Sequence, residues 1–125
     1  MKNIKAQQLL NKIQRDLMRN GIIINTLLND LKKLRTIVVE EEANPLLAKA
    51  LRLTYEHIEN FEGFEIAIPD DEPVEEGEET PENTVATGQE SLDYLLSLMA
   101  DPENKVNKIE LREYVNALNT YAEEN

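Results

Sequence analysis

The sequence predicts an all-α protein, and the strongest indication is an apolar heptad pattern in its first third. Between residues 3 and 38, apolar side chains recur at alternating steps of three and four, which is the spacing of one helix face. A second apolar stripe follows residues 45–61, and shorter stripes follow within residues 87–125. Because hydrophobic residues make up 41% of the chain and aromatic residues only 5%, we expect a core built mainly from Leu and Ile on packed helices.

The heptad stripe supplies the candidate partner-binding residues. It is more apolar than a lone helix in water can tolerate, so we expect helix-on-helix packing, either as a seam between chains or as the inner face of a bundle. A polar residue at one core position either fixes the register of paired chains or caps a helix. The candidates, in chain order, are Leu10, Ile13, Leu17, Asn20, Ile24, Leu27, Leu31 and Leu34.

The first segment has two interpretations. One is a long helix of roughly 35 residues, and the other is a helical hairpin broken at Asn20 and Gly21. The apolar residues on both sides of Gly21 share one arc at 100° per residue, which favours a long helix that is kinked or interrupted there. Against it stand Gly21, which costs about 1 kcal/mol inside a helix, and the β-branched run 22–24.

A second helix is predicted to begin at Asn44 and Pro45, with Asn44 as the N-cap. Residues 62–63 end it, and residues 64–68 alternate apolar and polar side chains, which predicts an edge strand or a strap across the helices. Residues 1–68 therefore form one helical body. The stripe of this helix comprises Leu47, Ala50, Leu51, Thr54, Tyr55, Ile58 and Phe61.

Two further regions complete the predicted organisation. Residues 69–86 are rich in Asp, Glu and Pro, which predicts a flexible acidic linker. Residues 87–125 predict a helix–loop–helix, in which residues 87–90 form a capping box and the last helix begins near Asp101 or Asn107. The apolar stripes of the two helices comprise Leu92, Leu95, Leu96 and Met99, then Leu111, Tyr114, Val115, Leu118, Tyr121 and Ala122.

The stretch from Asp101 to Glu113 resembles the calcium-binding loop of an EF-hand. If Ile109 takes the eighth loop position, Glu113 falls on the twelfth, where the bidentate carboxylate belongs. The chain departs from the pattern at the first position, which is Pro102, at the fifth and at the required glycine. Too few oxygen ligands remain, so we expect a capped helical hairpin with no bound metal.

Charge is distributed unevenly along the chain, whose net charge is −12. Residues 1–38 carry +6, residues 39–82 carry −13 and the remainder carries −5. The whole chain repels nucleic acid, and we expect protein partners instead. One basic helix face, opposite the apolar stripe, comprises Lys5, Lys12, Arg15, Arg19 and Lys33.

No catalytic pattern is present. His57 is the only imidazole, and we expect it on a helix surface at the edge of the second stripe. The chain has no cysteine and too few glycines for a phosphate loop, so we predict neither enzyme activity nor a cofactor. The absence of a signal peptide and of a long apolar run predicts a cytoplasmic or otherwise intracellular protein, or a virion component, without membrane contact.

The expected function is therefore non-catalytic: a helical oligomerisation or adaptor component of a larger assembly. Small acidic helical chains of this kind occur among phage and bacterial structural or accessory proteins, which is an analogy of fold alone. The alternative is an acidic regulator or decoy that acts on nucleic-acid-binding proteins, or a protein that contacts nucleic acid through its basic N-terminal helix.

Overall fold

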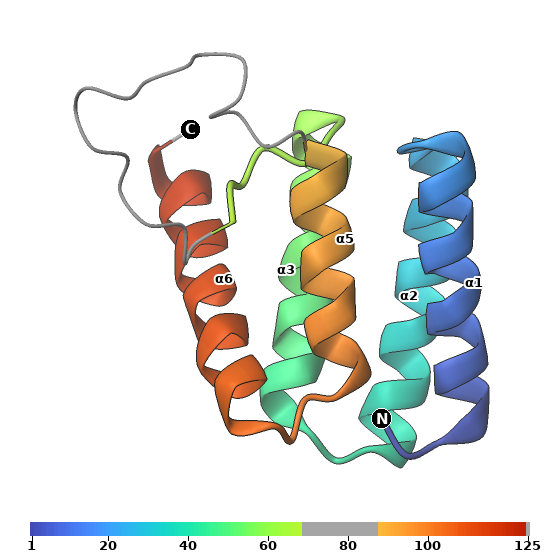
Figure 1. Ribbon diagram of the computed structural model, residues 1–125. Helices are drawn as coiled ribbons and strands as arrows, with labels where there is room; N and C mark the ends of the chain where they lie inside the picture. Colours follow the sequence, from blue (N-terminus) through green and yellow to red (C-terminus); the bar gives the residue numbers. More distant parts are fainter. Residues whose placement is uncertain (69–87, 125) are drawn as a thin grey trace, which may run out of the picture.

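A computed structural model describes residues 1–68 and 88–124, and within them the protein is an all-α bundle (Figure 1). The predicted fold class is thereby confirmed. The helices are α1 (Ile4–Asn20), α2 (Ile24–Glu41), α3 (Pro45–Phe61), α5 (Gly88–Ala100) and α6 (Lys105–Glu124). None of these helices is long and apolar enough to cross a bilayer.

The helices pack as neighbours in the cyclic order α1, α2, α3, α6, α5 and back to α1. Consecutive helices run antiparallel, whereas α3 and α6 run in the same direction side by side (Figure 1). One apolar core is shared by all of them. The helical body of residues 1–68 thus packs directly on the C-terminal hairpin through the α1–α5 and α3–α6 contacts.

The interruption expected near Gly21 is a full reversal of the chain. Helix α1 ends at Asn20, α2 begins at Ile24, and the two pack as an antiparallel hairpin. Gly21 has φ 74° and ψ −162°, a backbone region that is essentially restricted to glycine. Of the two interpretations, the structure therefore shows the helical hairpin, and the preference for one long helix was wrong.

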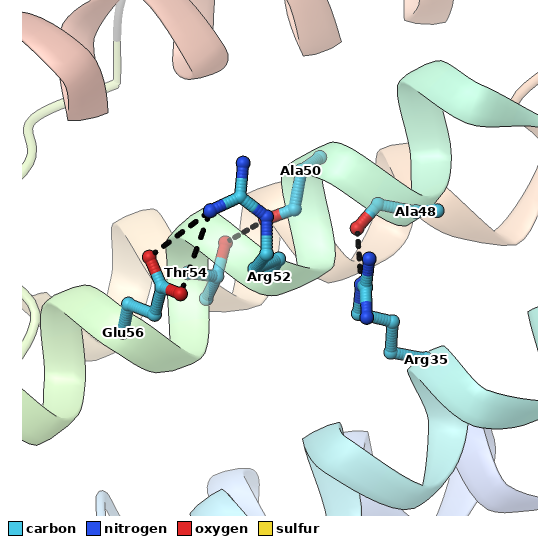
Figure 2. Close-up of polar contacts among 6 residues, drawn as sticks. All are labelled: Arg35, Ala48, Ala50, Arg52, Thr54 and Glu56. Atoms are coloured by element: carbon cyan, nitrogen blue, oxygen red, sulfur yellow. Dashed lines mark hydrogen bonds and ion pairs between the residues drawn. The ribbon is translucent and has the colours of Figure 1, made fainter. Parts of the chain in front are cut away.

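Helix α3 begins and ends close to the predicted residues. The side chain of Asn44 accepts a hydrogen bond from the Leu47 N–H (3.1 Å), and Pro45 occupies the first turn. The buried Thr54 hydroxyl donates to the Ala50 carbonyl (2.7 Å), so no polar group is left unpaired there. From α2, the Arg35 Nε donates to the Ala48 carbonyl (3.2 Å), which ties the two helices together (Figure 2).

Residues 62–68 cross the end of the bundle as a strap without strand hydrogen bonding. Phe64 and Ile66 are buried, whereas Glu65 and Ala67 are exposed, as the alternating pattern predicts. The strap starts at Glu62, which has the left-handed φ of 58° that ends many helices. The strap also lies against the start of α5, since a Cβ added to Gly88 would collide with the Phe64 carbonyl oxygen.

The C-terminal hairpin has a short turn. Residues 101–104 separate α5 from α6, so Lys105–Glu113 is helical and does not form a twelve-residue calcium loop. Helix α6 begins at Lys105 because Asn104 caps it, accepting hydrogen bonds from the N–H groups of Val106 (2.9 Å) and Asn107 (3.1 Å). The predicted acidic linker (69–86) and the Thr87 cap lie outside the described residues.

Candidate functional site

Most of the candidate partner-binding residues lie in the core of this chain. Ile24 is partly buried and Asn20 is exposed as the last residue of α1. The other candidates are buried, with at most 7% of the surface of any one exposed: Leu10, Ile13, Leu17, Leu27, Leu31 and Leu34. Other helices of the same chain bury these residues, since α1 packs on α2 and α5, and α2 packs on α3.

A pocket opens between α1 and α2 at the turn that joins them, and it includes some of these candidates. Its volume is about 120 Å³. Ile13, Leu17 and Leu27 are its buried apolar residues, and Ile23 is 48% exposed. We name it the tip pocket, and it is lined by Ile13, Asp16, Leu17, Asn20, Gly21, Ile23, Thr26, Leu27 and Asp30.

An ion-pair cluster borders the tip pocket and joins its two helices. Lys12 Nζ lies 2.7 Å from Asp30 Oδ2 on α2 and 2.9 Å from Asp16 Oδ2 on its own helix. These hydrogen bonds, first that of Asp30 and then that of Asp16, raise the pKa of Lys12. Because one ammonium faces two carboxylates, the border of the pocket keeps a net negative charge.

One exposed apolar side chain lies among the residues that line the tip pocket. It is Ile23, in the turn itself, which is 48% exposed. Ile22 and Ile24 are partly buried against the core. The sequence carried a signal for this surface, because the run 22–24 includes apolar residues outside the heptad register.

The opposite end of the same hairpin is closed by a carboxylate. Both oxygens of Glu42 accept hydrogen bonds from the Lys2 N–H (3.0 and 3.1 Å), and one also accepts from the Asn3 N–H (2.6 Å). Burial pushes the pKa of Glu42 up, but these bonds together with the positive charges of the amino terminus and Lys2 outweigh it, so the pKa is lowered. The polar contacts of this hairpin therefore lie at its ends and edge.

The placement of His57 on the surface was wrong. Only 4% of this residue is exposed, and its Nε2 accepts a hydrogen bond from the Glu65 N–H at 2.9 Å. The rings of Phe61, Phe64 and Tyr121 surround it, with centroids at 4.9, 5.4 and 5.0 Å. The sequence could not show this, because two of these rings come from the strap and from α6.

Within residues 1–68 and 88–124, no group of three His, Asp or Glu side chains is placed to hold a metal ion. The tip pocket contains carboxylates, amide and hydroxyl groups over an apolar floor, an arrangement suited to an apolar group with a polar rim.

Comparison with known proteins gives no further guide, since no protein-family model, no curated protein and no solved structure matches this chain.

Proposed function

We propose that this chain is a non-catalytic helical component of a larger assembly, and that it associates with protein through the tip of the α1–α2 hairpin. The observation that carries the proposal is the tip pocket, an apolar-floored hollow whose lining includes the exposed side chain of Ile23. Association through this surface differs from the predicted seam, because Leu10, Leu31 and Leu34 stay in the core.

The size of the tip pocket favours one anchoring side chain. Its volume of about 120 Å³ is somewhat below that of an engineered apolar cavity of about 150 Å³ that binds benzene. One aliphatic group of about the size of Leu therefore fits it. A single apolar anchor in a desolvated pocket, surrounded by a polar rim, is the usual form of an energetic hot spot in protein interfaces.

The simplest partner is a second copy of the chain, which brings its own exposed Ile23 to the contact. We expect sedimentation equilibrium of the full chain to give a mass that is a multiple of 14.3 kDa. Ile23→Glu should return the mass to that of one chain. The matched control is Val106→Glu, which changes a side chain that is 60% exposed on α6 and should leave the mass unchanged.

A single-chain mass at every concentration would contradict self-association through the tip. Loss of association in both variants would show that added charge, rather than the site, is responsible. An intracellular or virion location and a structural or accessory role in phage or bacteria belong to the same proposal. They are supported by the absence of cysteine and by analogy of fold alone.

A second candidate function is nucleic-acid contact through α1. Lys5, Arg15 and Arg19 are exposed on one side of this helix, and none of them forms an ion pair with another described residue. Phosphate contacts made by these groups would weaken steeply as salt rises. Retention on a DNA column at low salt, lost when the three are changed to Gln, would support it, and indifference of the native chain to DNA would exclude it.

A further inference from the structure

His57 joins three parts of the fold at one end of the bundle. It belongs to α3, it accepts the backbone N–H of Glu65 in the strap (2.9 Å), and its ring contacts Tyr121 of α6 (5.0 Å). Phe64 of the strap contacts the His57 ring at 5.4 Å and the Tyr114 ring at 6.4 Å. The strap therefore closes over the junction of α3 and α6, with His57 beneath it.

The hydrogen bond fixes which nitrogen of His57 carries the proton. Because Nε2 accepts from Glu65, the neutral ring must be protonated at Nδ1. Nδ1 is buried and has no hydrogen-bond partner in the described part of the chain. A second proton would have to bind at Nε2, where it would point at the Glu65 N–H and replace an attractive contact with two opposed donors.

Among the described residues the strap has few other polar contacts, although Gly88 of α5 lies close to the Phe64 carbonyl. The Glu65 N–H bond to His57 is the polar contact that the described residues show for residues 64–68. An open groove runs between residues 65–68 and residues 116–124 of α6, so the strap is not packed tightly along that side. Phe64 and Ile66 are its buried anchors, with 4% and 6% of their surface exposed.

We propose that His57 and the strap form a pH-sensitive latch, in which protonation of the imidazole releases residues 62–68 and uncovers the apolar surface of α3 and α6 beneath them. Release gives the charged ring access to water and removes the opposed donor. Phe61 and Tyr121 stay in place because they belong to α3 and α6, so only the Phe64 contact is lost.

The charged and titratable groups around His57 set the direction of its response. On the strap the group is Glu65, whose backbone N–H bonds to His57, and on α6 it is Tyr121, whose ring lies 5.0 Å from the imidazole. On α3 the neighbouring Glu56 pairs with Arg52 at 3.3 Å. Burial lowers the pKa of His57, and the charge of Glu65 opposes that shift without cancelling it. The closed latch is therefore stable at neutral pH and opens on the acid side of the ordinary histidine range.

The lowered pKa of His57 determines how opening of the latch depends on pH. The open state binds a proton with an ordinary histidine pKa near 6.5, whereas the closed state binds one only at lower pH. Between these two values the opening equilibrium rises up to tenfold for each unit that the pH falls. Because the chain contains one histidine, the imidazole signal in NMR reports this group alone.

The test is hydrogen exchange of the full chain between about pH 7.5 and 5, corrected for the intrinsic pH dependence of exchange. We expect protection of the amides of residues 64–66 to fall as the His57 signal titrates, while amides in α1 and α2 keep theirs. His57→Gln keeps a hydrogen-bond acceptor without a titrating ring, so its strap should stay protected across the range.

Several results would overturn the latch. In the native chain, strap amides whose protection does not change as the imidazole titrates would do so. So would an equal loss of strap protection in His57→Gln, or a loss of protection that affects all helices together with the strap. If His57→Gln does not fold, Glu65→Pro serves instead, because it removes the donor and leaves His57 intact. That variant should expose residues 64 and 66 at neutral pH and raise the titration midpoint of His57 toward 6.5, and an unchanged midpoint would exclude the proposal.

Discussion

The α1–α2 and α5–α6 hairpins differ in where their polar contacts lie. In α1–α2 the polar links lie at the edge, where the Lys12 side chain that reaches Asp30 is 47% exposed. In α5–α6 they lie inside. Tyr114 and Ser91 are fully buried, and the Tyr114 hydroxyl lies 2.9 Å from both the Ser91 hydroxyl and the Ser91 carbonyl.

A second internal contact strengthens the α5–α6 side, since the Tyr94 hydroxyl donates to Glu110, which is itself buried. Buried, satisfied polar networks rigidify a packing arrangement and specify it. The α1–α2 hairpin keeps an apolar interior that opens at its tip. By this comparison α5–α6 is the more rigidly specified hairpin, and the partner-binding surface that we propose lies on α1–α2.

The largest expected effect tests whether the two hairpins share one core. Leu34 on α2 and Leu95 on α5 are both fully buried, and each change to Ala should lower the free energy of unfolding by about 2–5 kcal/mol. Urea denaturation followed by circular dichroism measures the loss. Val39→Ala, at a position that is 53% exposed on α2, is the control and should stay within about 0.5 kcal/mol of the native chain.

Two separate unfolding transitions, with Leu34→Ala affecting one and Leu95→Ala the other, would show that the hairpins fold independently and would break the shared-core interpretation.

A smaller effect should distinguish buried from edge contacts. Tyr114→Phe removes the hydroxyl that contacts Ser91 and should lower the free energy of unfolding by about 1–3 kcal/mol, with little dependence on salt. Lys12→Met removes the edge contact to Asp30, and its effect should be smaller and should shrink further as salt rises. Paired denaturation curves at low and high salt measure both, and equal salt-independent losses would contradict the distinction.

The smallest effect concerns the closed end of the α1–α2 hairpin. Because the pKa of Glu42 is lowered in the folded chain, its contribution to stability is complete above its unfolded pKa and is lost as pH falls through the folded value. Glu42→Gln should therefore be less stable than the native chain at neutral pH. The gap should narrow in acid, and a gap that persists unchanged below about pH 3 would contradict the charge-based explanation.

Helix positions were predictable because their signals are local. The Asn44 cap, the apolar stripe of α3 and the buried residues of α5 follow from neighbouring residues alone. The reversal at Gly21 could not be predicted from local signals in the same way, because Ile24 and the residues after it keep the helical phase of α1. A preserved phase suits a long helix and an antiparallel hairpin equally well, and only the backbone conformation of Gly21 separates them.

The predicted stripe contains four of the nine residues that line the tip pocket, and it does not indicate the pocket itself. Ile13, Leu17, Asn20 and Leu27 were identified as members of a line along one helix, and the structure gathers them around a pocket. The contact between Lys12 and Asp30 joins residues 18 positions apart, which no helical spacing indicates.

The most direct test of the folded-back hairpin is the sign of the stability change in Gly21→Ala. In the hairpin, a side chain at φ 74° and ψ −162° is strained, and we predict a loss of about 1–3 kcal/mol in the free energy of unfolding. In one continuous helix, the same change would remove a poor helix former and would add about 1 kcal/mol. A gain in stability would therefore contradict the reversal at Gly21 and everything built on it.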